Sequence, residues 1–81
     1  MIALSPQTVE DRIRRRLFHR GETLRKSRSA KAIEQMGRYF IVETWTNALV
    51  ASHCTLEGLA HELRVLRRNE TVGAMQESHA L

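Results

Sequence analysis

A regular apolar stripe marks the first helix of the chain. One apolar residue recurs every four positions, as on one face of a helix: Val9, Ile13 and Leu17. Ser5 precedes Pro6, a typical helix start, because serine accepts a backbone hydrogen bond at the N-cap and proline suits the first helical position. We predict a helix over residues 6–20, with Gly21 as its C-terminal stop.

The stretch that follows this helix has few apolar residues. Residues 22–29 are mostly polar and charged. That composition fits either an edge strand, whose charged side chains discourage unwanted pairing, or an extended loop. Ser29 is a candidate N-cap for a short helix over residues 30–36, and Gly37 is a candidate stop for it.

The strongest β pattern covers residues 38–53. Positions 38–45 are rich in aromatic and β-branched residues, and a second segment follows at 48–53. Thr46-Asn47 between them can form a tight turn, since asparagine tolerates positive φ. With a two-residue loop both faces of this hairpin are partly apolar, with Phe40, Val42, Leu49 and Ala51 on one face and Tyr39, Ile41, Trp45 and Val50 on the other. At least two further elements must then pack on the hairpin.

The last amphipathic segment begins at Thr55, a natural N-cap. Its apolar residues are three and four positions apart, as in a helix: Leu56, Leu59, Ala60, Leu63 and Leu66. Asn69 can close this helix. The remaining residues are small and polar without periodicity, so we predict one domain over residues 1–69 and a flexible tail over residues 70–81.

These elements together predict a small α+β domain. Their order is helix, possible strand, two hairpin strands and helix, with a short antiparallel sheet built on the hairpin at 38–53. The two longer helices can cover the two faces of the sheet, or both can lie on one face. With 81 residues, the chain is long enough for one domain with a modest core.

Positive charge is concentrated in one part of the chain. Nine of the thirteen Lys and Arg residues lie between Arg12 and Lys31, where Glu22 is the one acidic residue. Residues 1–40 carry a net charge of +6, whereas residues 41–81 carry −2. Such a basic block creates a local field that attracts polyanions, above all phosphate backbones.

The basic block predicts a binding site for nucleic acid. Arginine contacts phosphate in a bidentate manner, and serine hydroxyls add neutral contacts. The predicted contact residues are Arg12, Arg15, Arg16, Arg25, Lys26, Ser27, Arg28 and Arg38. The competing interpretation is a solvated basic face that keeps a small protein in solution. No helix-turn-helix or zinc-finger pattern favours the reading of a base sequence, and the choice between DNA and RNA stays open.

Three aromatic residues in the hairpin raise the question of base stacking. Rings on an open sheet face can stack on unpaired bases. We expect Phe40 and Trp45 to lie in the core of so small a domain. Tyr39 follows Arg38 and is the predicted exposed ring, available for stacking or for a protein interface.

Other classes of function have less support in the sequence. Cys54 is the single cysteine, which excludes an intramolecular disulfide and a four-cysteine zinc site. His53 and Cys54 would point to opposite faces of a strand, and with His61 they do not complete a zinc site, so we expect no metal and no cofactor. Neither a phosphate-binding glycine loop nor a catalytic motif is present, and we do not expect an enzyme. Without an apolar run of about 20 residues we expect no membrane partner, and we expect the cytoplasm as the location.

The sequence therefore predicts a small regulatory or accessory protein that binds nucleic acid mainly through its phosphates. The alternative is a protein–protein interaction module, an adaptor or inhibitor that docks on an acidic surface of a larger protein. In that case the hairpin surface would be the sensitive region, and it could also form a homodimer.

Overall fold

The computed structural model describes residues 1–73 of the chain and shows a mixed α+β fold. Its elements in chain order are β1 (Ile2–Leu4), α1 (Pro6–Phe18), β2 (Glu22–Lys26), α2 (Ala30–Met36), β3 (Tyr39–Glu43), β4 (Leu49–Cys54), α3 (Leu56–Glu62) and β5 (Glu70–Val72). The predicted order of a helix, a possible strand, a hairpin and a helix is confirmed. β1, β5 and the pairing between them are additions to that prediction.

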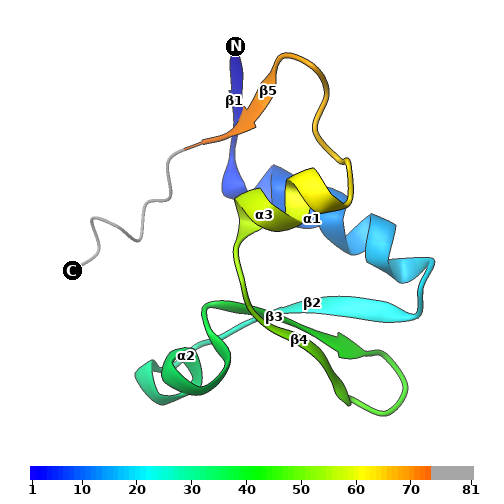
Figure 1. The fold of residues 1–81 in the computed structure, drawn as a ribbon, viewed down its shortest axis with the longest axis vertical. Coiled ribbons are helices and arrows are strands. Elements are labelled where there is room, and N and C mark those ends of the chain that lie inside the picture. The colour runs from blue at the N-terminus through cyan, green and yellow to red at the C-terminus, as the bar shows by residue number, and fades with distance from the viewer. Residues whose placement is uncertain (74–81) are drawn as a thin grey trace.

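Three antiparallel strands form the main sheet, in the order β2-β3-β4, and β1 pairs with β5 in parallel. The polar segment that follows α1 is therefore an edge strand. α1 and α3 lie together on one side of this sheet, while α2 lies at one end of it, away from them (Figure 1). Of the two predicted arrangements, α1 and α3 adopt the one in which both helices cover the same face.

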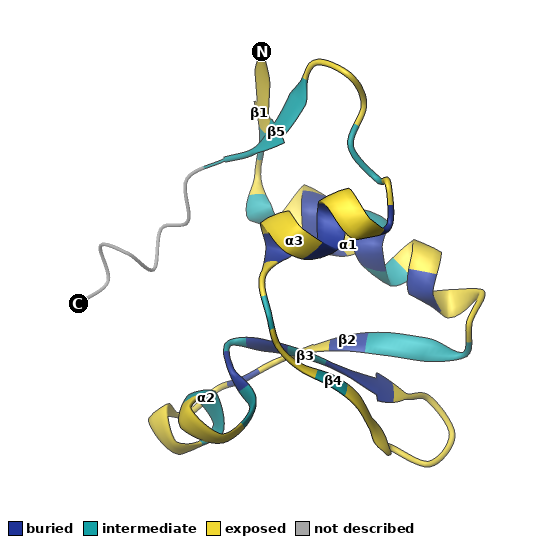
Figure 2. Cartoon of the chain, in the orientation of Figure 1, coloured by how far each residue is buried: buried dark blue, intermediate teal, exposed yellow. Residues whose placement is uncertain are grey.

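The core lies between the two helices and the sheet, as the dark segments of Figure 2 show. α1 contributes the whole predicted stripe of Val9, Ile13 and Leu17, each at most 1% exposed. The sheet contributes Leu24, Tyr39 and Ile41, and α3 with its C-cap contributes Leu56, Leu59, Ala60 and Leu63. The apolar spacing that predicted the helices is thus the spacing that fills the core.

All three helices begin at the predicted N-caps. The hydroxyl of Ser5 accepts a hydrogen bond from the backbone N–H of Thr8, at 3.2 Å. Ser29 and Thr55 make the equivalent bonds, at 3.1 Å and 3.0 Å. Gly37 ends α2 with φ of +80°, and its Cα hydrogens face the backbone of His53 so closely that a Cβ would lie 2.4 Å from the His53 Cα. A larger residue at this position would push α2 and β4 apart.

The hairpin turn is longer than the predicted two-residue turn. β3 ends at Glu43 and β4 begins at Leu49, so five residues connect them. Asn47 does adopt the left-handed conformation, with φ of +61°. The register between the strands shifts twice, between the pairs Tyr39↔Cys54 and Ile41↔Ala51 and again before Val42↔Leu49. These irregularities break the simple alternation of faces that a two-residue loop would give.

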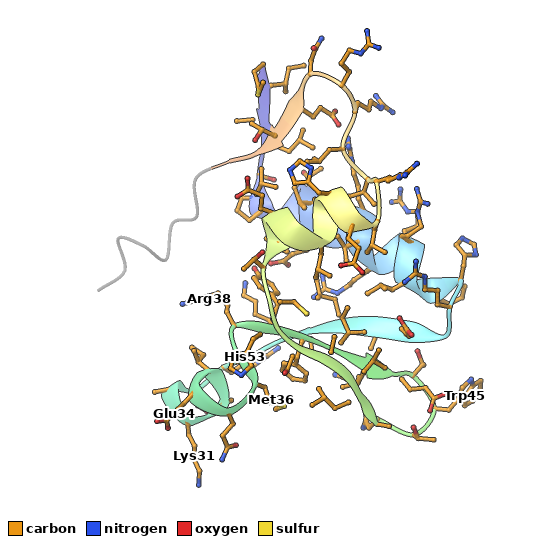
Figure 3. All side chains as sticks on the ribbon, in the orientation of Figure 1. Lys31, Glu34, Met36, Arg38, Trp45 and His53 are labelled. Atoms are coloured by element: carbon orange, nitrogen blue, oxygen red, sulfur yellow. The ribbon has the colours of Figure 1, made fainter. Side chains whose placement is uncertain are left out.

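The prediction for the aromatic residues of the hairpin is wrong for two of the three. Tyr39 is 2% exposed, because its ring faces α1 in the core, whereas Trp45 is 90% exposed. Trp45 lies in the longer turn and projects outward from its tip (Figure 3). Phe40 is half-buried. The reversal follows from the turn, because Trp45 no longer belongs to a strand that packs on the helices.

The last helix is shorter than its apolar pattern predicts. α3 ends at Glu62, and Arg64 has a left-handed φ of +56°, which turns the chain back toward α1. Val65 and Leu66 pack against the core from this returning segment. The apolar spacing therefore continues past the end of the helix, because the side chains of this irregular segment also reach the core.

The predicted boundary between domain and tail at residue 70 also differs from the structure. Residues 70–72 form β5, whose partners on β1 are Ile2, Ala3 and Leu4. Residues 74–81 of the predicted tail lie outside the described residues. Pairing with β1 gives residues 70–72 backbone hydrogen bonds that a free tail would lack.

Candidate nucleic-acid interface

α1 divides the basic block of the sequence between two of its flanks. Residues three, four and seven positions apart lie on the same side of a helix. One flank thus carries Gln7, Glu10 and Arg14, and the other carries Arg12, Arg15, Arg16 and His19. The buried stripe occupies the side of α1 that faces the core. Each flank lines a groove of its own.

The first groove, here called the arginine groove, runs between α1 and the segment that follows α3. Its lining residues are Arg12, Arg15, Arg16, His19, Arg64, Val65, Leu66 and Arg67, around a volume of about 420 Å³. Five of these eight residues are arginines, and none of the eight is acidic. The left-handed turn at Arg64 brings the second wall of the groove opposite the first.

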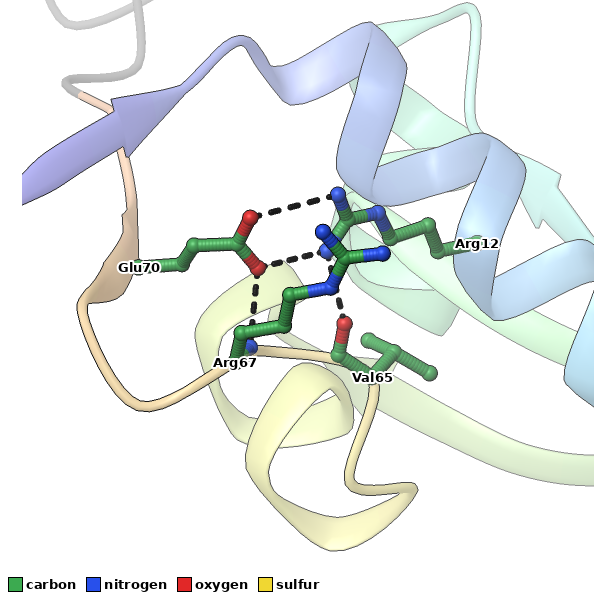
Figure 4. A network of polar contacts seen from close by, with 4 residues as sticks. All are labelled: Arg12, Val65, Arg67 and Glu70. Atoms are coloured by element: carbon green, nitrogen blue, oxygen red, sulfur yellow. Dashed lines mark hydrogen bonds and ion pairs between the residues drawn. The ribbon is translucent and has the colours of Figure 1, made fainter.

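A polar network at Arg12 joins the two walls of the arginine groove (Figure 4). Nη1 of Arg12 donates to Oε1 of Glu70 at 2.7 Å and to the carbonyl oxygen of Val65 at 3.0 Å. Nη2 of Arg12 donates to Oε2 of Glu70 at 3.4 Å, which makes the pair bidentate. The backbone N–H of Arg67 donates to Oε1 of Glu70 at 2.8 Å. This network holds the segment after α3 against α1.

The same network shifts the ionisation of both charged partners. The hydrogen bond from Arg12 and then the one from the Arg67 backbone lower the pKa of the Glu70 carboxyl. The hydrogen bond to Glu70 raises the pKa of the Arg12 guanidinium. Arg12 is therefore committed to a partner within the chain, and its role is to position the groove.

Four arginines of the groove remain available to a ligand. Arg15 and Arg16 are exposed on α1, and Arg64 and Arg67 are exposed on the opposite wall. None of their guanidinium groups forms an ion pair with another residue of the range 1–73. A cleft lined by charge of one sign over protein walls concentrates the field and attracts counter-ions. The arrangement suits a ligand with several negative charges.

The second groove, here called the β2 groove, lies between α1 and β2 and has a volume of about 580 Å³. It is lined by Gln7, Glu10, Arg14, Leu24, Arg25, Lys26, Ser27 and Arg28. Glu10 is 4% exposed and accepts a hydrogen bond from the Tyr39 hydroxyl at 2.6 Å. The same carboxylate lies 3.5 Å from the Arg14 guanidinium and 3.6 Å from the Lys26 ammonium. One buried negative charge thus offsets two of the cations in this groove.

The structure distributes the predicted contact residues unequally. Arg15 and Arg16 lie in the arginine groove, and Arg28 is exposed and lines the β2 groove. Arg25 donates a hydrogen bond to the side-chain oxygen of Asn47 at 3.4 Å. Arg12 and Lys26 are each paired with a carboxylate, as described above. The sequence-adjacent cations therefore do not form one continuous surface.

Three other predicted residues have roles in the fold. The Ser27 hydroxyl is buried and donates to the carbonyl oxygen of Gly37 at 2.6 Å. The Ser27 hydroxyl therefore donates its hydrogen bond within the protein. Tyr39 is buried in the core, which removes its ring from a stacking surface. Arg38 is half-buried and lines neither groove.

Residues that sequence reasoning did not assign to the site are Arg64, Arg67 and His19. The arginines look like the ordinary basic end of an amphipathic helix, because cations near a helix C-terminus suit its dipole. No glycine marks the turn at Arg64 that takes them across to α1. The signal available in the sequence was the distribution of positive charge, since Arg64, Arg67 and Arg68 are the only Lys or Arg residues after Arg38.

The structure also describes the residues weighed for other chemistry. No group of three or more His, Cys, Asp or Glu side chains in residues 1–73 is placed to hold a metal ion. Burial, and secondarily the charge of Glu62, raise the pKa of the Cys54 thiol, which disfavours the reactive thiolate. Within the same residues, no helix has the length and apolar character needed to span a membrane.

Comparison of the chain with protein-family models, with curated proteins and with solved structures gives no match. The function must therefore be argued from the geometry and charge of the two grooves.

Proposed function

We propose that this protein binds nucleic acid through phosphate contacts in the arginine groove and acts as a small accessory or regulatory factor. The observation that carries the proposal is the convergence of five arginines from two separate segments on a groove that no acidic residue lines. Four of them have no ion-pair partner among the described residues, so their charge is available to phosphates.

The geometry of the groove favours phosphate over a single small anion. Arg15 and Arg16 come from α1, whereas Arg64 and Arg67 come from the opposite wall. Guanidinium groups on both walls can contact successive phosphates of one backbone, each in a bidentate manner. The ion pair between Arg12 and Glu70 fixes the spacing of the walls before a ligand arrives, which reduces the ordering cost of binding.

The decisive experiment compares two triple variants that lose the same charge. Arg15→Ala/Arg64→Ala/Arg67→Ala removes three cations from the arginine groove, and Arg25→Ala/Lys26→Ala/Arg28→Ala removes three from the β2 groove. Fluorescence anisotropy with labelled duplex DNA, single-stranded DNA and RNA across a salt series measures affinity. We expect the first variant to lose more than about tenfold in affinity and about 2 to 3 units of the log–log salt slope.

The matched β2-groove variant is the control for net charge. We expect it to weaken binding less than the arginine-groove variant, because Glu10 already offsets Arg14 and Lys26. Equal losses in the two variants would show that only the overall charge matters. No binding by the unmodified protein even at low salt would overturn the proposal.

A protein partner with an acidic surface is the second candidate, and β4 is the observation that favours it. β4 is an outer strand of the sheet, and its Leu49 and Val50 are 54% and 49% exposed. An outer strand with exposed apolar side chains can pair with a strand of another chain. Leu49→Ser/Val50→Ser would then abolish binding of that partner, measured by sedimentation, and leave affinity for nucleic acid unchanged.

A further inference from the structure

The turn between β3 and β4 presents an exposed tryptophan on an ordered support. Trp45 is 90% exposed and projects from the tip of the hairpin (Figure 3). The turn is held by several hydrogen bonds: from Asn47 N–H to the Glu43 carbonyl at 2.9 Å, from Ala48 N–H to the Thr46 hydroxyl at 3.2 Å, and between the side chains of Thr46 and Glu43. A large ring kept in water on a well-bonded turn contributes little to the core and is accessible to a ligand.

The same turn is bonded to the loop between α1 and β2. The backbone N–H of Thr44 donates to the carbonyl oxygen of Gly21 at 2.8 Å. Just before Gly21, Phe18 is 77% exposed, and its ring meets the His19 ring edge to face with centroids 6.0 Å apart. His19 lines the arginine groove. His19 thus belongs both to the arginine groove and to the ring pair, and Gly21, two residues later, is bonded to the turn that carries Trp45.

The charge at the turn is mixed, unlike the charge of the groove. The walls of the arginine groove carry unpaired guanidinium groups, whereas at the turn Glu22 and Glu43 are direct cross-strand partners and Arg25 is hydrogen-bonded to Asn47. The two carboxylates weaken the attraction of the turn for phosphates, so a nucleic-acid backbone is favoured in the arginine groove instead. An exposed ring there is suited instead to the uncharged face of a base.

We propose that Trp45 stacks on an unpaired base of a single-stranded nucleic acid whose phosphates lie in the arginine groove. The inference rests on the proposed function and names its substrate class. Bases in a duplex are stacked on one another and offer only their edges, whereas unpaired bases expose faces that aromatic side chains bind. Phe18 and His19, in the chain segment that links the groove to this turn, offer further rings to such a strand.

Tryptophan emission reports on Trp45 alone, because it is the single tryptophan of the chain. The experiment titrates the protein with a labelled oligothymidine and, separately, with the duplex that it forms with oligoadenosine. Label anisotropy reports binding, and tryptophan emission reports stacking in the same sample. We expect the single strand to quench Trp45 emission and the duplex to leave it nearly unchanged.

Substitution of the ring supplies the second measurement. We expect Trp45→Ala to weaken binding of the single strand by about 5- to 150-fold, the range for loss of one stacked base. Trp45→Phe should keep most of the affinity, since it keeps a ring. Neither variant removes a charge, so the salt slope should not change. Because Trp45 is exposed, both variants should fold normally, which circular dichroism checks.

The outcomes separate this inference from the function on which it rests. Single-strand binding without quenching, or equal affinity of Trp45→Ala and the unmodified protein, would overturn the stacking role and leave phosphate binding in the arginine groove standing. Equal quenching by the duplex would also overturn the preference for a single strand. Absence of binding to either oligonucleotide would overturn both proposals.

Discussion

The arginine groove and the β2 groove both draw on the same run of cations, yet they differ in how much of that charge is available. In the β2 groove the buried carboxylate of Glu10 lies within 3.6 Å of two cations. In the arginine groove the nearby carboxylate, Glu70, is bound by Arg12 and leaves four other arginines unpaired among residues 1–73. The density of cations in a sequence therefore overestimates the charge available to a ligand where a buried carboxylate pairs with those cations. It underestimates that charge where arginines from a distant part of the chain line the same groove.

Reversing charge in each groove should give the largest difference between them. Arg64→Glu/Arg67→Glu and Arg25→Glu/Arg28→Glu change the net charge equally, and all four residues are exposed. We expect the first variant to lose at least about 100-fold in affinity for an oligonucleotide and the second about tenfold or less, measured by anisotropy at fixed salt. A larger loss in the second variant would move the binding site to the β2 groove.

Removing Glu10 should make the two grooves more alike. Glu10→Ala deletes the acceptor of the Tyr39 hydroxyl and the partner of Arg14 and Lys26, so we expect a loss of about 1–3 kcal/mol in the free energy of unfolding, measured by urea denaturation. Glu10→Gln should cost less, since its amide oxygen can still accept from the hydroxyl. In either background Lys26→Ala should weaken nucleic-acid binding more than it does in the unmodified protein. If Lys26→Ala has the same effect on affinity with and without Glu10, then Glu10 does not offset the positive charge of the β2 groove.

Acid should loosen the arginine groove through Glu70. Its pKa is lowered in the folded protein, so its ionised form adds stability above the ordinary value of 4.5, and this contribution is lost as the pH falls through the lowered pKa. We expect Glu70→Gln to be less sensitive than the unmodified protein to acidification below that value, in urea denaturation at several pH values. Glu57→Gln, which removes an exposed carboxylate from α3, should retain the normal sensitivity. Equal sensitivity of both variants would deny the ion pair this role.

The smallest effect is expected at Arg38, a predicted contact residue that lines neither groove. Arg38→Ala should change affinity by less than about twofold, because a cation outside the contact surface acts only through screened long-range attraction. Arg16→Ala is the matched single-charge control within the arginine groove and should cost more. A loss at Arg38 equal to that at Arg16 would extend the binding surface past the grooves.

Local signals in the sequence predict the helices of this fold because the forces that form them act within one or two turns, whereas the pairing of β1 with β5 joins distant residues and was not predicted. The caps at Ser5, Ser29 and Thr55 depend on a hydroxyl and an N–H three residues later. The apolar stripe of α1 is likewise a local pattern. The end of α3 could not be predicted in this way. Arg64 turns the chain without a glycine, and Leu66 has the spacing of a helical residue although it lies outside the helix.

The candidate site could be predicted only in part, because it is made by residues far apart in the chain. The run from Arg12 to Arg16 indicates a positive helix, but no local pattern tells that Glu70 will bind Arg12. The burial of Tyr39 likewise depends on Glu10, which is 29 residues away. Cations close in sequence are therefore separated by α1, while Arg64 and Arg67 are brought to its other flank.

The bond between Arg12 and Glu70 also has a consequence for the order in which the protein is made. The two residues are 58 positions apart, so nearly the whole described chain must be closed into one loop before the bond can form. Loop-closure entropy makes contacts of such long range slow to form. A nascent chain on the ribosome has Arg15 and Arg16 early, but it lacks the opposite wall and the carboxylate that aligns it. The growing polypeptide is thus cationic well before it has a shaped groove, and synthesis of β5 supplies the carboxylate.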